Sequence, residues 1–248
     1  MDIYREPKIT LVAKQVFSDH PGIEWSTDTG IPAEQLVEFG GRICYMSYGK
    51  GRKTNKEYIE HLLESGHGSV LEHAQFTFVF EGISRSLTHE LIRHRAGFAY
   101  SQLSQRYVDE SDAQFVMPPA MIGDAPLEAA WRAQVESAQA SYVALVDSLM
   151  TRYAWVDDKV HRRKMAREAA RGVLPNSTET KIVVTGNARA WRTMLELRSS
   201  EGAELEIRRM AVAVLRVLQT EAPAFFSDFE IYVAADRREA ARLSYHKV

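Results

Sequence analysis

The sequence of 248 residues predicts an α+β fold in which a mixed sheet packs against long helices. Segments typical of strands and of long helices follow each other without the regular alternation of βαβ folds. The sequence contains neither G-x-G-x-x-G nor a P-loop, so we expect no Rossmann or Walker site for a nucleotide. We expect one domain over 1–248, with the charged end 236–248 at its periphery.

Four segments are expected to be strands, because they alternate or are rich in aromatic and β-branched residues. These segments are 8–17 (KITLVAKQVF), 76–80 (FTFVF), 180–186 (TKIVVTG) and 229–233 (FEIYV). Proline, glycine and aspartate predict a loop over 18–30, and lysine, arginine and glycine predict a mobile loop over 48–53.

Start and stop signals place the first two helices. Pro32 suits the first position of a helix that continues through the segment GRICYMS. Thr54 and Glu57 form a capping box for a second helix, and Gly66 is expected to end it.

Later helices follow a break at 117–119 (MPP). A long helical tract is expected over 127–171, with an interruption near 155–158, and two further helices over 188–200 and 204–220. One stripe of the last helix is apolar and predicts core or a subunit contact: Ile207, Met210, Ala211, Val214, Leu215 and Leu218.

Composition narrows the classes of function. The net charge of −2 and the pI near 6.5 argue against a general nucleic-acid-binding surface. Cys44 is the single cysteine, which excludes an internal disulfide framework and suits a reducing, cytoplasmic location. No apolar run has the length of a membrane span, and the N-terminus lacks a signal-peptide core.

The stretch 85–107 (RSLTHELIRHRAGFAYSQLSQRY) is the most informative part of the chain. Its cationic and titratable residues are Arg85, Arg93, Arg95, Arg106, His89 and His94. A basic helix end that runs into a Gly-containing, Ser/Gln-rich loop suits an anionic, planar ligand. The alternative is that these arginines are solvated or paired with acidic neighbours.

A short helix is expected to open this stretch, capped by Ser84 or Ser86. Its apolar face would comprise Ile83, Leu87 and Leu91. The neighbouring pairs on this helix would be Glu90 with His94 and His89 with Arg93.

A zinc site of the H-E-x-x-H type is excluded, although His89 and Glu90 begin like one. Arg93 stands in place of the second histidine, and arginine does not ligate zinc. His94 lies about 140° around the helix from His89 and cannot substitute for it.

The stretch resembles the flavin-dependent thymidylate synthases, whose hallmark is R-H-R followed by a serine-containing loop that ends in S-x-R. Segments 93–95 (RHR) and 104–106 (SQR) match this pattern. The last arginine follows the first by thirteen residues here, against twelve in the commonest family spacing, and the first serine of the motif is missing near Phe98 and Ala99. A one-residue insertion at 96–97 explains the spacing, since Gly97 can adopt an unusual backbone turn.

Further blocks resemble the same family in the same order. They are 66–69 (GHGS) with 72–73 (EH), 170–175 (ARGVLP), 187–189 (NAR) and 197–198 (LR). The resemblance extends over roughly residues 8 to 233.

The resemblance implies two sets of ligand residues. FAD contacts are implied at Ser69, Arg93, His94, Arg95, Gln102, Asn187, Ala188, Arg189 and Thr193. Contacts with dUMP are implied at Glu90, Leu91, Ile92, Arg93, Gln102, Leu103, Ser104, Gln105, Arg106, Arg171 and Arg198. Ser104 and Arg106 are expected near the phosphate. Arg198 is expected to be catalytic, because a fixed cation favours ionisation at the uracil N3.

The alternative for each of these arginines, Arg171 included, is a structural ion pair. His67 could merely cap or pack between Gly66 and Gly68, and His73 is expected to be structural.

The resemblance implies reductive methylation of dUMP to dTMP by a homotetramer with active sites at subunit junctions. In that chemistry NADPH reduces bound FAD, 5,10-methylenetetrahydrofolate donates the one-carbon unit, and the reduced flavin supplies the hydride. No metal, nucleic-acid or membrane partner is implied. Cys44 lies outside the matched blocks, so we expect a buried small hydrophobe rather than a nucleophile.

Two other classes of function remain open. A nucleic-acid-binding module could use the arginines on phosphates and stack bases on Phe98 and Tyr100, but the acidic overall balance opposes it. A flavoprotein oxidoreductase unrelated to dUMP could share only the cofactor site. Whether dUMP perturbs the flavin spectrum would separate this class from a thymidylate synthase.

Overall fold

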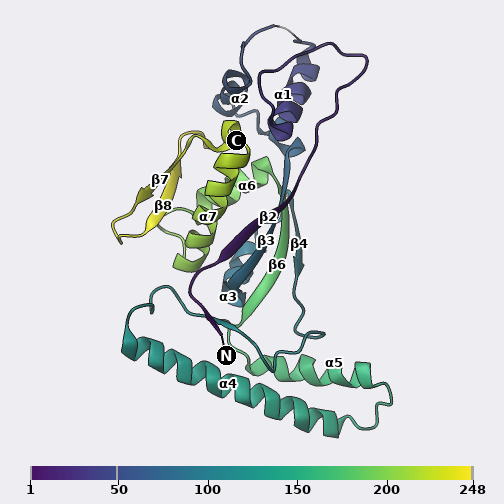
Figure 1. The fold of residues 1–248 in the computed structure, drawn as a ribbon, viewed down its shortest axis with the longest axis vertical. Helices are drawn as coiled ribbons and strands as arrows, with labels where there is room; N and C mark the ends of the chain where they lie inside the picture. Colours follow the sequence, from purple (N-terminus) through teal and green to yellow (C-terminus); the bar gives the residue numbers. More distant parts are fainter. Residues whose placement is uncertain (1, 49, 247–248) are drawn as a thin grey trace. The chain divides into compact units, whose positions relative to one another are not determined.

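The largest sheet in the computed structural model has four strands in the order β2-β3-β6-β4, and the structure describes residues 2–48 and 50–246 (Figure 1). The strands are β2 (Lys8–Lys14), β3 (Gln75–Ser84), β6 (Glu179–Asn187) and β4 (Phe98–Gln102). β2, β3 and β6 confirm three predicted strands. Phe76, Phe78 and Phe80 of β3 are all buried, which accounts for the aromatic content of that segment.

Strand β4 lies where the sequence predicts a loop. Its ends are marked by two hydrogen bonds, from Asn187 N to Gly97 O at 3.1 Å and from Leu103 N to Lys181 O at 2.9 Å. The strand is only five residues long, and its sequence FAYSQ combines two aromatic residues with small and polar ones, so its pattern predicts a strand weakly.

The described residues form two compact units, and the architecture is α+β. The first unit comprises 2–8, 80–91 and 101–182, and the second comprises the described residues of 9–79, 92–100 and 183–246. All four strands of the sheet have residues in both units. The single domain over 1–248 stays a prediction.

The first unit contains a long helical hairpin (Figure 1). Its elements are β1 (Ile3–Tyr4), α3 (Arg85–Leu91), β5 (Phe115–Val116), α4 (Ala125–Arg152), α5 (Lys159–Ala170) and the 3₁₀ turn η2 (Arg171–Val173). α4 packs against α5, β1 pairs in parallel with β5, and the side chains of Asp124 and Asp158 cap the two long helices. The predicted helical tract and its interruption are confirmed.

Helix α3 is shorter than the sequence predicts. Ser84 caps it, with Oγ accepting a hydrogen bond from Leu87 N at 3.0 Å, but Ile83 belongs to β3. The helix ends at Leu91, so the predicted helical pairs of Glu90 with His94 and of His89 with Arg93 are wrong.

The second unit contains the remaining elements. They are α1 (Pro32–Tyr45), α2 (Asn55–Glu64), the 3₁₀ helix η1 (Gly68–His73), α6 (Ala188–Arg198), α7 (Leu205–Glu221), α8 (Pro223–Phe226), β7 (Phe229–Val233) and β8 (Glu239–Leu243). Pro32 opens α1, and the predicted capping box of Thr54 and Glu57 is present on α2. The loop 18–30 is confirmed, but within the predicted loop 48–53 Gly49 lies outside the described residues.

Helix α7 forms the core of the second unit together with α6. The six residues of its apolar stripe are completely buried. Arg192 of α6 is also buried, and it forms an ion pair with Asp228 at 2.6 Å. The stripe is therefore core, as one of the two sequence interpretations predicts.

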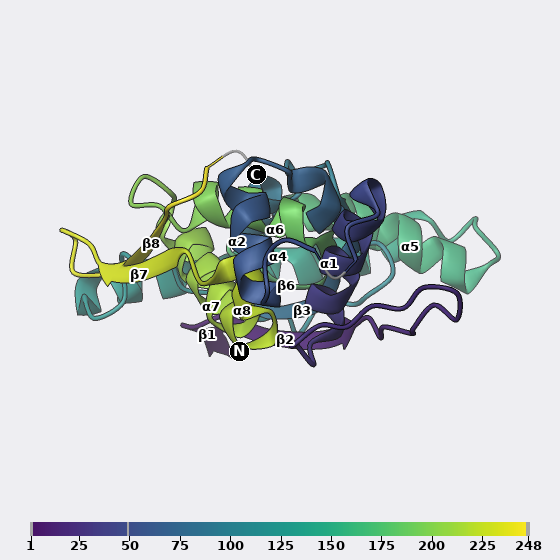
Figure 2. The ribbon, with the colours of Figure 1, turned by 90° about the horizontal axis from the view of Figure 1, so that it is seen from above.

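The C-terminal segment carries a strand. β8 pairs antiparallel with β7, and Ala240 and Ala241 are buried. This hairpin lies beside α7 on the side away from α1 (Figures 1 and 2). The side chain of Asp236, where the predicted tail begins, pairs with Arg208 of α7.

Cys44 contradicts its sequence prediction, since its side chain is exposed. It lies on the last turn of α1, beyond the residues that bury this helix, and its Sγ donates to Gly40 O at 3.3 Å. Within the described residues, no helix combines the length and the apolar character that crossing a membrane requires.

Candidate functional site

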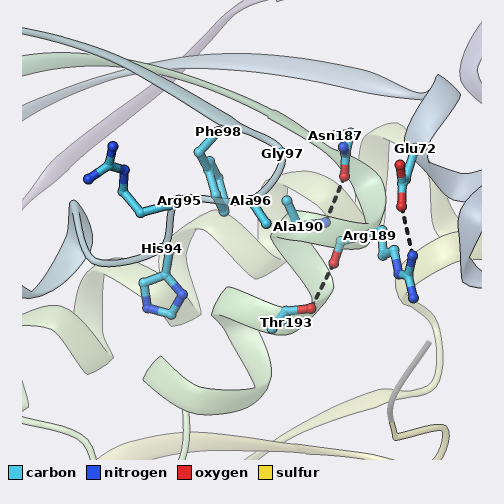
Figure 3. A pocket seen from close by; sticks show the side chains of 10 residues that line it. All are labelled: Glu72, His94, Arg95, Ala96, Gly97, Phe98, Asn187, Arg189, Ala190 and Thr193. Carbon is cyan, nitrogen blue, oxygen red and sulfur yellow. Dashed lines mark hydrogen bonds and ion pairs between the residues drawn. The ribbon is translucent and has the colours of Figure 1, made fainter.

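A pocket of about 380 Å³ lies in the second unit, between the segment that leads into β4 and the start of α6 (Figure 3). Its lining residues are Glu72, His94, Arg95, Ala96, Gly97, Phe98, Asn187, Arg189, Ala190 and Thr193. The two segments are brought together by the pairing of β4 with β6. The lining combines polar side chains with apolar ones, a mixture typical of small-molecule sites.

Asn187 connects the two walls of the pocket. Its side-chain Oδ1 caps α6 by accepting from Ala190 N at 2.8 Å, while its backbone N–H donates to Gly97 O. The capping leaves the amide Nδ2 with its two hydrogens as the remaining donor group. The N-terminus of α6 also carries a partial positive charge, so this end of the pocket favours an anion.

The only carboxylate among the lining residues is neutralised. Glu72 accepts from Arg189 Nη1 at 2.7 Å (Figure 3). Arg95 contributes a second guanidinium, whose side chain makes no hydrogen bond or ion pair within the described part of the chain. The pocket therefore has a net positive charge.

His94 contacts Arg198 directly. Arg198 Nε donates to His94 Nε2 at 3.0 Å, so His94 Nε2 must be unprotonated. Burial, and secondarily the charge of Arg198, lower the pKa of His94 below its ordinary value of 6.5. His94 is thus held neutral beside a fixed cation.

Aromatic rings support the apolar wall. Phe98 packs edge-on against Trp191, with 4.9 Å between ring centroids, and stacks on Tyr100 at 5.8 Å. The Tyr100 hydroxyl donates to His94 O at 2.6 Å, and burial raises the pKa of Tyr100 to about 12. Both rings are thus engaged within the protein, which disfavours the nucleic-acid alternative that requires them as stacking platforms.

A second candidate group lies in the first unit, in the turn 104–108. Val108 N and Tyr107 N both donate to Ser104 O, and Arg106 N donates to Ser104 Oγ at 3.3 Å. Side chains of α5 hold this turn: Arg167 donates to Tyr107 O and pairs with Asp109. We call residues 104–108 the serine turn.

Arg106 lies in the serine turn, and Arg85 contacts the residue that precedes it. Arg106 uses Nε and Nη2 to pair with Glu168 at 2.9 Å, which leaves Nη1 for another partner. The Arg171 side chain makes no hydrogen bond or ion pair within the described residues, so the structural ion pair considered for it is not found there. Arg85 donates from Nη2 to Leu103 O at 2.8 Å, and burial is the main cause that lowers its pKa.

Most residues of the predicted FAD set line a pocket of the second unit. Of the FAD set, five residues line the pocket: His94, Arg95, Asn187, Arg189 and Thr193. Ser69 lines a separate pocket of about 320 Å³, which shares Arg189 with the first. Arg93, Gln102 and Ala188 are not among the lining residues of either pocket.

The dUMP set is divided between the units. Ile92, Arg93 and Arg198 belong to the second unit, and the remaining eight residues belong to the first: Glu90, Leu91, Gln102, Leu103, Ser104, Gln105, Arg106 and Arg171. Gln102 Nε2 donates to the hydroxyls of Thr88 and Thr180, so its amide donors are engaged internally. Gln105 is buried, and its Nε2 has no hydrogen-bond partner among the described residues.

Sequence reasoning assigned no role to Ala190 in the pocket or to Glu168 near the serine turn. It noted Glu72 only within a matched block, Phe98 only as a ring that could stack bases, and Arg85 only as one of several cations. Glu168 carries no sequence signal, because it pairs with an arginine that is distant in the chain. Arg85 could have been found, since it opens the arginine-rich stretch.

Comparisons with known proteins show the family of this chain. The family model described as thymidylate synthase complementing protein (Thy1) matches residues 28–224. The chain is similar to proteins named flavin-dependent thymidylate synthase from Mycobacteroides abscessus (53% identical), Mycobacterium avium (51%) and Mycobacterium tuberculosis (50%). Each of these matches extends over 238 residues and covers 94% of this chain and 94% of the relative.

Proposed function

Because this chain belongs to the flavin-dependent thymidylate synthase family, we propose that its second-unit pocket binds FAD and its serine turn binds the phosphate of dUMP. Its activity is flavin-dependent thymidylate synthesis. The reaction is the reductive methylation of dUMP to dTMP, with 5,10-methylenetetrahydrofolate as the one-carbon donor and NADPH as the reductant. The observation that supports the cofactor assignment is the net positive pocket at the start of α6.

The donor set of the pocket fits FAD. Arg95, Arg189, the Asn187 amide and the N-terminus of α6 can hold its anionic part, while Phe98 and Ala190 supply an apolar face for a ring. Bound FAD supplies the hydride that completes the methyl group. The protein residues bind and orient the cofactor and exclude water from it.

The serine turn provides donors for a phosphate. Arg106 retains its Nη1 hydrogens and Arg171 its whole guanidinium, so both can contact phosphate oxygens in a bidentate or forked manner. The Ser104 hydroxyl, which accepts from Arg106 N, keeps its own hydrogen for a phosphate oxygen. Arg85 is a further cation beside Leu103, and we add it to the proposed set.

Arg198 is the proposed catalytic residue. Its guanidinium is fixed by the hydrogen bond to His94, and a fixed cation next to the uracil N3–H favours loss of that proton. The deprotonated ring is the better nucleophile toward the one-carbon unit. No cysteine nucleophile is required, and Cys44 is assigned no step.

The proposed assembly is a homotetramer with shared active sites. Helix α4 supports contacts between copies: it fully buries Val135 and Tyr142, whereas Leu127, Val143 and Leu145 remain exposed. A cytoplasmic location is proposed on the strength of the single cysteine.

Spectroscopy and product analysis test the proposed function together. The purified protein should be yellow, and dUMP should perturb the visible spectrum of its flavin. With NADPH and methylenetetrahydrofolate it should form dTMP. If NADPH reduces the flavin but dUMP leaves its visible spectrum unchanged, the result would instead favour the oxidoreductase alternative.

A further inference from the structure

Gly97 lies at a close approach between the two walls of the flavin pocket. Its φ is +74°, a conformation that residues with a side chain rarely adopt. A Cβ at this position would lie 2.6 Å from Asn187 Nδ2 and 2.8 Å from Ala190 Cβ. Both distances are shorter than any normal contact, so a side chain at position 97 must displace Asn187 or Ala190.

The residue nearest to Gly97 in this approach is Asn187, which caps the N-terminus of α6. Asn187 caps the helix through Oδ1 and donates its backbone N–H to Gly97 O at 3.1 Å. Its Nδ2 is the group left over for a ligand, and it is also the group that a Cβ on residue 97 would meet first. Displacing the Asn187 amide would therefore move a cofactor donor and weaken a helix cap at once.

The same close packing occurs on the other side of the loop. Phe98 lies over Gly186, where a Cβ would come within 2.5 Å of the Phe98 ring. Ring packing against Trp191 holds Phe98 in this place. The segment 96–98 therefore lies against the end of β6 and the start of α6 with glycine at both contacts, and it cannot move away without losing the Phe98 packing.

We propose that Gly97 is a positioning residue of the flavin pocket: its lack of a side chain lets the loop lie on α6 and keeps the Asn187 amide aimed at the cofactor. The inference rests on the proposed assignment of FAD to this pocket. It also explains how the chain accommodates the residue inserted at 96–97. Gly97 acts through Asn187 and has no contact of its own with the reacting atoms.

The test compares the FAD affinity of apo-protein variants, measured by flavin fluorescence, with their unfolding midpoints. Gly97→Ala should weaken FAD binding by ~10-fold or more. Gly123→Ala is the matched control, because Gly123 has φ +91° but no atom lies within 4 Å of the place that its Cβ would take. It imposes the same backbone strain without a collision and should bind FAD with the wild-type Kd.

A double-mutant cycle tests whether the effect passes through Asn187. Asn187→Ser keeps a capping hydroxyl but removes the amide that the new Cβ would meet. In the Asn187→Ser background, Gly97→Ala should cost less than ~3-fold in FAD affinity. Equal losses in both backgrounds would show that Gly97 acts independently of Asn187 and would overturn the inference.

A second variant separates collision from strain. Gly97→Asn tolerates a positive φ better than alanine but still carries a Cβ, so it should lose FAD affinity as Gly97→Ala does while lowering the unfolding midpoint of the apo protein less. If neither variant folds, or if Gly97→Ala binds FAD normally, Gly97 has no positioning role. A wild-type chain that binds no FAD would overturn the proposed function itself, and the inference with it.

Discussion

Arg198 and His94 are joined by a hydrogen bond of 3.0 Å, in which Arg198 Nε donates to His94 Nε2. The resemblance assigns the first residue to the substrate and the second to the cofactor, and the structure puts them in contact within one unit. The bond exists only while His94 Nε2 is unprotonated. The orientation of the proposed catalytic cation therefore depends on the protonation state of a cofactor residue.

This dependence predicts a loss of stability in mild acid. Burial, and secondarily Arg198, lower the folded-state pKa of His94 below 6.5, so the unfolded chain binds the proton more readily. The free energy of unfolding should therefore fall as the pH drops through 6.5 toward the folded-state pKa and should not depend on His94 above 6.5. The measurement compares unfolding of the apo wild type and of His94→Gln from about pH 8 to about pH 5. A difference between the two proteins that does not change with pH would contradict this.

Arg198→Lys keeps the charge but loses the planar guanidinium. Lysine has a different reach and no Nε donor, so it should neither maintain the contact with His94 nor present a fixed cation to the uracil ring. We expect FAD to remain bound while the kcat for dTMP formation falls by ~100-fold or more. If the variant purified without flavin and recovered on adding excess FAD, Arg198 would be a cofactor residue instead.

Local sequence signals predicted most helices and strands, whereas contacts between distant segments are known only from the structure. The capping box of Thr54 and Glu57 and the apolar stripe of α7 are encoded within single elements, so the sequence reveals both. Strand β4 was missed because its formation depends on pairing with β6, more than 75 residues later. The contact between His94 and Arg198 spans 104 positions in the chain, and no local pattern could predict it.

Some residues of the candidate site could likewise be identified from the sequence, and others could not. Arg95, Asn187 and Arg189 were singled out through their motifs and line the pocket, but Ala190 has the residue type of an ordinary core and carries no functional signal. The exposure of Cys44 also escaped prediction, because the burial of a residue on the last turn of a helix depends on what packs there.

Comparing variants of Arg106 and Glu168 shows whether Arg106 binds the phosphate of dUMP or serves only in a structural ion pair. Arg106→Ala and Glu168→Ala each remove the same exposed pair, which is worth at most ~1 kcal/mol. If Arg106 binds the phosphate, Arg106→Ala should raise the KM for dUMP by ~30-fold or more, and Glu168→Ala by less than ~5-fold. Steady-state kinetics with dUMP as the varied substrate provide the measurement. Equal, small effects would assign Arg106 to structure.

Cys44→Ser should retain dTMP formation. The thiol is exposed and its Sγ donates only to a backbone carbonyl of its own helix among the described residues, so the substitution should change stability by less than ~0.5 kcal/mol. The assay measures dTMP formation and FAD content side by side. Complete inactivity in a folded, FAD-loaded variant would mean that the mechanism uses a cysteine nucleophile after all.

Shared active sites can be tested through Arg106 and Arg198. Arg106 belongs to the first unit and Arg198 to the second, and we predict that they reach a given dUMP from different subunits. The experiment co-expresses Arg106→Ala and Arg198→Ala chains under two different tags and purifies the mixed oligomer. If the pair is split between subunits, some sites combine an intact Arg106 with an intact Arg198, and dTMP formation returns.

The parent homo-oligomers provide the baseline, because every site in each of them carries a lesion. If both residues came from one chain, every site in the mixture would also carry a lesion, and its activity would not exceed that of the parents. Adding Arg198→Ala chains to the wild type under the same two tags controls for the effect of mixing itself. A monomer by light scattering, or a mixed oligomer as inactive as its parents, would rule out the split arrangement. Recovered activity would also explain why the residues assigned to one substrate are found in separate units of the chain.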